Sequence, residues 1–116
     1  MTDQANIFLF SYGTLQLASV QISSFGRLLE GHDDMMPGYR QDLVEITDEE
    51  VIRKSGQKFH PIVVPSDDAL DKVAGKVFAI TKDELAAADR YEVADYKRVE
   101  VRLDSGKCAW VYVKAE

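Results

Sequence analysis

The C-terminal part of the chain carries the pattern that most restricts the fold. Apolar and charged side chains alternate over residues 98–103, and a second alternating run covers residues 108–113. Alternation with a period of two predicts strands with one buried face. The segment between the runs, Asp104-Ser105-Gly106-Lys107, is typical of a tight turn. We therefore predict an antiparallel hairpin at this end of the chain.

Other strands are predicted from short apolar runs. Ile7–Phe10 is a continuous apolar run and predicts a strand buried on both faces. Further strands are expected near residues 43–46, 60–64 and 73–80, with a short one near Val51–Ile52. Gly75 lies inside the 73–80 strand, which indicates a bulge or a close approach of another backbone segment.

Helices are predicted in two places. The clearer one begins at Thr81, because Thr81 and Glu84 fit a capping box; we expect it to end near Tyr91–Val93. Residues 17–29 show roughly helical spacing, which Gly26 interrupts. His32-Asp33-Asp34 is predicted to be a polar loop, and Asp48-Glu49-Glu50 a charged turn or bulge.

This succession of elements predicts an α+β domain. Strands dominate and form a mostly antiparallel sheet, which can curl into a small β-barrel with flanking helices. The length of 116 residues fits one domain over residues 1–116, and the composition, 46% hydrophobic and 29% charged, is that of a globular protein.

Charge and hydropathy exclude several classes of partner. The formal net charge of −6 argues against nucleic acid, because phosphate contacts require a basic patch. The longest apolar run is far too short for a membrane span, and the N-terminus lacks the basic start of a signal peptide. Cys108 is the one cysteine, which suits a reducing compartment. We expect a cytoplasmic protein without membrane contact.

Common catalytic and cofactor motifs are absent from the sequence. It has no phosphate-binding loop, no dinucleotide fingerprint, no serine nucleophile elbow and no spaced histidine pair for a metal. His32 and its two aspartates are adjacent and do not converge on one ion, so we expect a solvated loop. Cys108 lies in a strand pattern without a basic partner, which predicts a buried structural thiol.

Two features remain as candidates for chemistry. The segment Ser11–Leu15 follows a buried strand, and a glycine turn there can point backbone N–H groups at a carboxylate or oxyanion. A plain structural turn is the alternative. Glu92 shares a helical stripe with Leu85 and Ala88, so its carboxylate can face inward and become a base with a raised pKa. The alternative is a carboxylate at a frayed helix end or one paired with Arg90 or Arg98.

Together these segments resemble the gamma-glutamylcyclotransferase-like family, which also contains the plant avirulence-induced-gene proteins. The resemblance rests on three motifs in order, spread over residues 7–113: Phe8-Leu9-Phe10-Ser11-Tyr12-Gly13-Thr14-Leu15, then Gly75-Lys76-Val77-Phe78, then Asp89-Arg90-Tyr91-Glu92 followed by Tyr96-Lys97-Arg98. It implies a small mixed β-barrel with flanking helices.

The resemblance also implies a reaction and roles for residues. Family enzymes release 5-oxoproline from a γ-glutamyl compound when the substrate's own α-amine attacks the γ-carbonyl, with no cofactor and no metal. Glu92 would be the general base, the backbone of Tyr12, Gly13, Thr14 and Leu15 would bind substrate, and Tyr96 would line the pocket. A non-catalytic module that binds a small carboxylate or a protein, and a purely structural role of these motifs, stay open. The sequence sets neither the leaving amine nor an oligomeric state.

Overall fold

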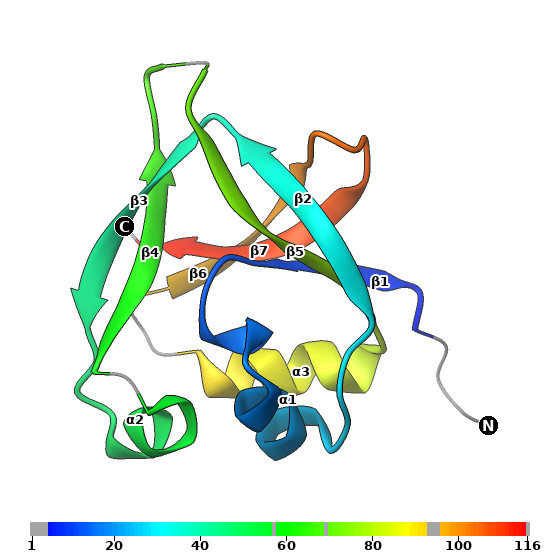
Figure 1. Cartoon of the computed structure of the whole chain (residues 1–116), viewed down its shortest axis with the longest axis vertical. Coiled ribbons are helices and arrows are strands. Elements are labelled where there is room, and N and C mark those ends of the chain that lie inside the picture. The colour runs from blue at the N-terminus through cyan, green and yellow to red at the C-terminus, as the bar shows by residue number, and fades with distance from the viewer. Residues whose placement is uncertain (1–4, 57, 69, 93–95, 116) are drawn as a thin grey trace.

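A mixed β-sheet forms the centre of the molecule, shown in Figure 1 as a computed structural model that describes residues 5–56, 58–68, 70–92 and 96–115. Its five strands lie in the order β2-β5-β1-β7-β6. The β1–β7 pair is parallel and the other pairs are antiparallel. The bounds of these strands are β1 Ile7–Ser11, β2 Gly31–Pro37, β5 Lys72–Ile80, β6 Tyr96–Arg102 and β7 Cys108–Lys114.

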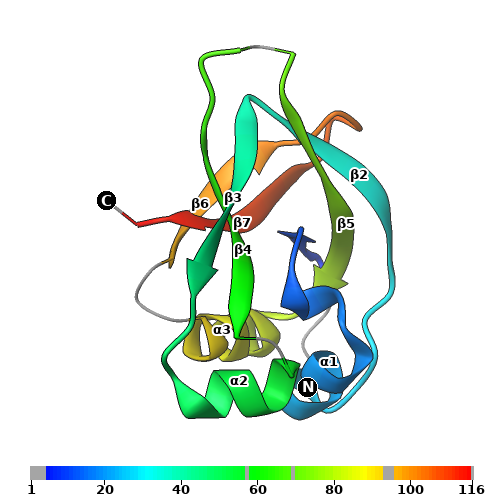
Figure 2. The same cartoon turned by 60° about the vertical axis from the view of Figure 1, so that its left-hand side comes forward.

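The predicted barrel is corrected by this topology, because the described strands do not close on themselves. Strands β3 (Tyr39–Glu45) and β4 (Phe59–Pro65) pair only with each other, as a separate two-stranded ribbon. The ribbon packs against β7 through β4 without joining its hydrogen-bonded ladder (Figure 2). The α+β class and the mostly antiparallel pairing are as predicted, and the C-terminal hairpin is confirmed as β6–β7.

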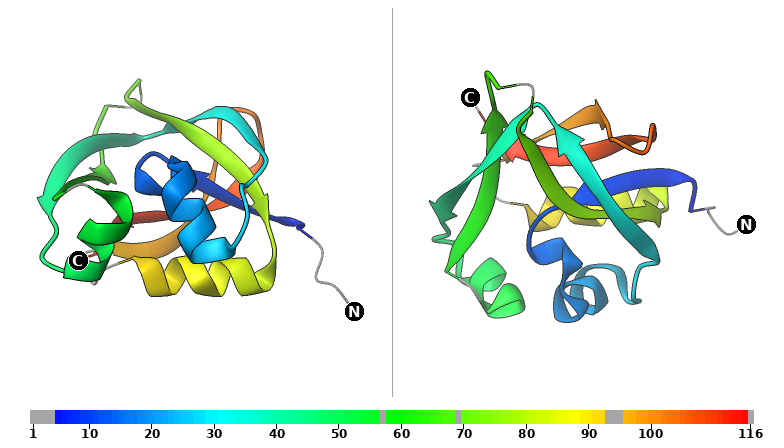
Figure 3. Two further views of the ribbon diagram at one scale, coloured as in Figure 1. Left: turned by 60° about the horizontal axis from the view of Figure 1, so that its bottom comes forward. Right: turned by 45° about the horizontal axis from the view of Figure 1, so that its top comes forward.

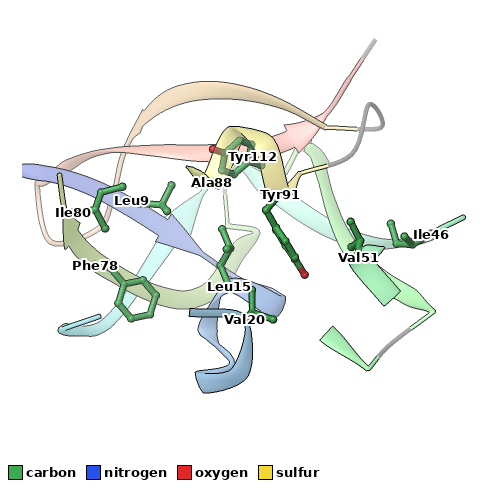
Figure 4. Packing of buried hydrophobic residues seen from close by; sticks show 10 residues of the cluster. All are labelled: Leu9, Leu15, Val20, Ile46, Val51, Phe78, Ile80, Ala88, Tyr91 and Tyr112. Carbon is green, nitrogen blue, oxygen red and sulfur yellow. The ribbon is translucent and has the colours of Figure 1, made fainter. Parts of the chain in front are cut away.

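Both faces of the central strands are buried, as the apolar run at the start of the chain predicts. On β1, Leu9 packs on one side of the sheet with the helices, and Phe10 packs on the other side. Figure 3 shows the helices gathered below one face, and Figure 4 shows the side chains packed there. This cluster contains Leu9, Leu15, Val20, Ile46, Val51, Phe78, Ile80, Ala88, Tyr91 and Tyr112.

The helices are α1 (Ala18–Phe25), α2 (Glu49–Ser55) and α3 (Lys82–Tyr91), with a short 3-10 turn, η1 (Thr14–Gln16), before α1. The capping box at the start of α3 is confirmed, since Glu84 and Thr81 bond each other's backbone N–H. α3 ends at Tyr91, and Val93 lies outside the described residues. None of the helices in the described ranges is long and apolar enough to cross a membrane.

Two predictions of local structure are wrong. The predicted turn and short strand near Val51 form α2, because the Asp48 side chain caps the helix by accepting from the N–H groups of Glu50 and Val51. The predicted loop at His32–Asp34 belongs to β2, where Asp34 is buried. Its carboxylate accepts hydrogen bonds from the backbone N–H groups of Met35 and Ser105 and from the Ser105 hydroxyl, which satisfies the buried charge.

Gly75 marks the close backbone approach that its place in the strand predicts. A Cβ atom at this position would lie 2.3 Å from the carbonyl oxygen of Ser11 and 2.7 Å from Cζ of Phe10. The missing side chain therefore lets β5 come close to the last residue of β1, where the chain leaves the sheet.

We expect Gly75→Ala to destabilise the protein by about 1–3 kcal/mol, the usual cost of overpacking, because backbone and a buried ring must move. The free energy of unfolding in urea measures this cost. Ala74→Ser, which changes an exposed neighbour in the same strand, is the matched control. A Gly75→Ala protein as stable as the control would contradict a close-packed junction between β5 and β1.

Candidate functional site

A small cavity lies where β1 leaves the sheet. It has a volume of about 20 Å³, which is room for about one water molecule. The cavity brings together the two features that the sequence analysis singled out, the Ser11–Leu15 turn and Glu92. Its described lining consists of Phe10, Ser11, Tyr12, Gly13, Thr14, Leu15, Pro61, Glu92, Tyr96 and Tyr112.

The turn is compact, and its Gly13 N–H donates to the Ser11 hydroxyl at 3.3 Å. Gly13 has φ −135°, so it does not use the positive φ that glycine permits. It is crowded instead, since a Cβ would lie 3.1 Å from Cγ of Pro61. The first hydrogen bond of η1 runs from Gln16 N–H to the Gly13 carbonyl. The N–H groups of Thr14 and Leu15 precede that bond and have no acceptor inside the helix.

Side-chain contacts with the core fix the position of the turn. The hydroxyl of Thr14 is hydrogen-bonded to the hydroxyl of Tyr91 at 2.7 Å, and the side chain of Leu15 is buried in the core beside the helices. The buried Gln21 side chain donates to the Leu15 carbonyl and accepts from the Leu29 N–H, at 2.9 Å each. These contacts fix the backbone of the turn, and the sequence analysis missed both Tyr91 and Gln21.

Glu92 follows the last residue of α3. Its N–H still donates to the Ala88 carbonyl at 3.0 Å, but its ψ of 138° is extended. The helical stripe therefore holds for the buried Ala88 and the partly buried Leu85, and the direction of Glu92 is set by the helix C-cap. The predicted approach of Glu92 to the turn is present, although the geometry that produces it differs from the predicted one.

The carboxyl group of Glu92 has an unusual protonation equilibrium. Burial raises its pKa to about 8, and the negative charge of Asp89 adds to the rise. Neither of the arginines considered as partners neutralises it: Arg98 Nε bonds Asp89 Oδ1 at 2.9 Å. Within the described part of the chain, no hydrogen bond or ion pair engages the Glu92 carboxylate. Such a group can change protonation near neutral pH.

Asp89 organises the residues beside this carboxyl group. It accepts hydrogen bonds from Arg98 and from the Tyr112 hydroxyl, the latter at 2.7 Å, and the Arg98 guanidinium lies 4.5 Å from the centre of the Trp110 ring. Tyr112 lines the cavity. Asp89 therefore affects the cavity in two ways: its hydrogen bond orients the Tyr112 ring, and its charge raises the pKa of Glu92. Tyr112 was not predicted as a site residue, because its only signal in the sequence is its place in the alternating strand.

Two tyrosines of the cavity wall, Tyr12 and Tyr112, stay neutral at physiological pH. Burial raises the pKa of Tyr12 well above its ordinary value, and Tyr96 and Glu92 add to the effect. Burial and the bond to Asp89 likewise raise the pKa of Tyr112. The Tyr12 hydroxyl donates to the Tyr112 carbonyl, and the Tyr96 hydroxyl donates to the Pro61 carbonyl at 2.8 Å. Among the described lining residues, Glu92 is the group that can exchange a proton near neutral pH.

The cysteine and the histidine considered in the sequence analysis do not line this cavity. Cys108 is exposed, which corrects the prediction of a buried thiol; its alternating position at the start of β7 faces solvent. His32 is an exposed residue of β2. Among the residues described, no group of histidine, cysteine, aspartate and glutamate could hold a metal ion.

Asp89→Asn should lower the pKa of Glu92 from about 8. The change removes one repelling charge and frees Arg98, while the amide oxygen can still accept from Tyr112. Titration of the Glu92 carboxyl carbon by NMR measures this shift. Asp83→Asn removes the same charge from an exposed position in the first turn of α3, so it is the control and should leave the titration in place. Equal titrations for both variants would remove Asp89 as a cause of the raised pKa.

Known structures share this fold at low sequence identity. A protein from Arabidopsis thaliana is 24% identical with a TM-score of 0.70 over 95% of this chain. A gamma-glutamyl cyclotransferase is 16% identical with a TM-score of 0.71 over 95%, and an uncharacterised protein from Pyrococcus horikoshii is 18% identical with a TM-score of 0.65 over 96%. The chain spans 69%, 67% and 80% of these three proteins, and 61% of a second Arabidopsis thaliana protein.

The sequence itself carries a family match. No curated protein sequence matches the chain. Residues 9–116, however, match the family described as "Gamma-glutamyl cyclotransferase, AIG2-like", and the match includes both the turn after β1 and Glu92. The chain therefore belongs to the gamma-glutamyl cyclotransferase, AIG2-like family.

Proposed function

We propose that the protein is a cyclotransferase that releases 5-oxoproline from a γ-glutamyl compound, with Glu92 as the general base. The α-ammonium of the substrate loses a proton to Glu92, and the resulting amine attacks the γ-carbonyl carbon. The new C–N bond closes the five-membered ring, and the ring nitrogen gives up a second proton. The old amide C–N bond breaks, and both protons go to the leaving amine, which departs as an ammonium ion. No atoms are gained or lost, and the reaction consumes no water and no cofactor.

The observation that carries this proposal is a partly buried carboxyl group with a pKa of about 8, placed beside the backbone donors of the turn. Free α-amino groups titrate near about 7.7–8.0. Proton transfer from an α-ammonium to Glu92 is therefore nearly balanced in free energy, which is the condition under which a general base is effective. An exposed glutamate has a pKa of about 4.3. Its pKa would lie several pKa units below that of the α-ammonium, so it would be too weak a base.

The turn supplies what the reaction needs at the other end of the cavity. The tetrahedral intermediate carries a developing negative charge on the former carbonyl oxygen, and backbone N–H groups stabilise such a charge. In this proposal the backbone of Tyr12, Gly13, Thr14 and Leu15 binds the oxyanion and the α-carboxylate of the substrate. The side chain of Tyr96 forms one wall.

A substrate requires more room than the cavity offers. A γ-glutamyl group is much larger than the one water molecule that about 20 Å³ accommodates. Substrate entry therefore requires side chains around the cavity opening to move, and such rotamer changes are common when a ligand binds. The small volume also favours a second candidate, a module that binds a small carboxylate without turnover; 5-oxoproline release by the wild-type protein decides between the two.

Glu92→Gln should reduce turnover by about 10²–10⁴, the usual contribution of a general base, because the amide keeps the shape but cannot take the proton. The assay is release of 5-oxoproline from a panel of γ-glutamyl dipeptides and γ-glutamylamines. The wild-type rate should rise with pH through about 8. Full activity of Glu92→Gln would show that another group is the base, and a wild-type protein inactive on the whole panel would favour the binding module.

The same variant separates a base from a structural carboxylate. Folding raises the pKa of Glu92 from 4.5 to about 8. The wild-type carboxyl group therefore does not destabilise the protein below pH 4.5, and the free energy of unfolding falls as the pH rises from 4.5 until it passes the folded-state pKa. Glu92→Gln should therefore melt at a higher temperature than the wild type at pH 9 and differ little at pH 5. A lower melting temperature at pH 9 would indicate that Glu92 is a stabilising ion-pair partner.

A further inference from the structure

Two large apolar side chains are exposed on the β3–β4 ribbon. Leu43 is 67% exposed and Phe59 is 53% exposed. Leu43 lies near the end of β3, and Phe59 is the first residue of β4. Figure 1 shows that this end of the ribbon leads to α2. Single exposed apolar residues are common on protein surfaces, so their position relative to other side chains decides whether they have a role.

The register of the ribbon places both residues on the face that carries Pro61. Leu43 is the direct cross-strand partner of Pro61, and Phe59 is two positions before Pro61 on β4. Residues two apart on a strand share a face, and direct partners have Cβ atoms about 4.5–5.5 Å apart. We call Leu43, Phe59 and Pro61 the apolar rim.

The apolar rim continues the wall of the cavity outward. The ring of Pro61 points at the catalytic turn, since its Cγ would lie 3.1 Å from a Cβ on Gly13. Its carbonyl accepts the hydrogen bond from Tyr96, another wall residue. Pro61 is thus shared by the cavity and the rim, and a group that projects from the cavity past Pro61 meets Leu43 and Phe59.

We propose that the apolar rim binds the substituent on the leaving amine, so that preferred substrates carry an apolar alkyl or aryl group on the γ-glutamyl nitrogen. This inference rests on the proposed function. The reaction buries the glutamyl part at Glu92 and the turn, and the leaving amine is the part of the substrate that must extend out of so small a cavity. Among the described residues, the rim is an apolar surface that adjoins the cavity through Pro61.

Charge and size also favour such an occupant. Glu45 is the cross-strand partner of Phe59, and Lys58 precedes Phe59 in the chain. These two side chains pair with each other at 3.4 Å, so together they offer little net charge to a carboxylate or ammonium group. Stable protein interfaces use about 20–30 residues on each side. Three residues are too few for that, but they match one alkyl chain or one aromatic ring.

Binding to the Glu92→Gln protein tests the inference without turnover. γ-Glutamyl benzylamide should bind about 10-fold more tightly than γ-glutamyl methylamide by calorimetry, the lower end of what apolar pockets discriminate. Adding Leu43→Ser and Phe59→Ser should bring the two affinities together. Adding Leu70→Ser instead, at a leucine 86% exposed in the loop before β5, is the matched control and should keep the preference.

Activity assays separate this inference from the proposed function. In the wild type, kcat/KM for the benzylamide should exceed kcat/KM for the methylamide by a similar factor, and the difference should lie in KM. Assaying γ-glutamyl-phenylalanine shows whether an apolar amino acid is accepted as the leaving group as readily as an apolar amine. Benzylamide-selective binding without any turnover would refute the proposed function and leave the rim in place. Equal binding of both amides to Glu92→Gln, or a rim variant that changes only the oligomeric mass in sedimentation, would overturn the inference.

Discussion

The burial of β1 on both faces is the constraint on which the rest of the structure depends. β1 lies between β5 and β7, and its side chains alternate between the core under the helices and the core under the β3–β4 ribbon. A strand in that position ends inside the protein. The turn that follows it therefore starts at the buried Ser11 and returns to the core at Thr14 and Leu15. Electrostatic interactions are stronger in such a low-dielectric environment than in water. Gly75 makes this possible, because it lets β5 follow β1 to its last residue.

The same burial sets the electrostatics of the site. Glu92 arrives at the end of β1 from the C-terminus of α3, and it finds phenol hydroxyls that are already committed to other acceptors. Arg98, one of the two arginines considered as counterions, is held by Asp89. The carboxyl group is left with desolvation and a neighbouring negative charge, and both raise its pKa. The Asp89–Arg98 pair thus protects the raised pKa of Glu92 by keeping the guanidinium occupied.

Different parts of the fold were predictable to different degrees. The C-terminal hairpin, the doubly buried β1 and the capped start of α3 all follow from patterns that act within a few residues. β2 was missed because the buried charge of Asp34 is satisfied by Ser105, which is 71 residues away. α2 was missed because its seven residues carry too few periodic apolar positions, although Asp48 is a good N-cap. The barrel describes the fold only loosely, because alternation shows which strands exist and not which of them pair.

The sequence by itself determined the kind of groups available: one turn with backbone donors after a buried strand, and one carboxylate at a helix end with Arg90 and Arg98 near it in sequence. Only the tertiary structure decided that they share a cavity, that Arg98 binds Asp89, and that Tyr112 and Pro61 complete the wall. It also decided that Leu43 and Phe59 lie beside Pro61. The physical reason is range. Capping, turns and periodicity are local, whereas a cavity depends on strand register and packing between segments far apart in the chain.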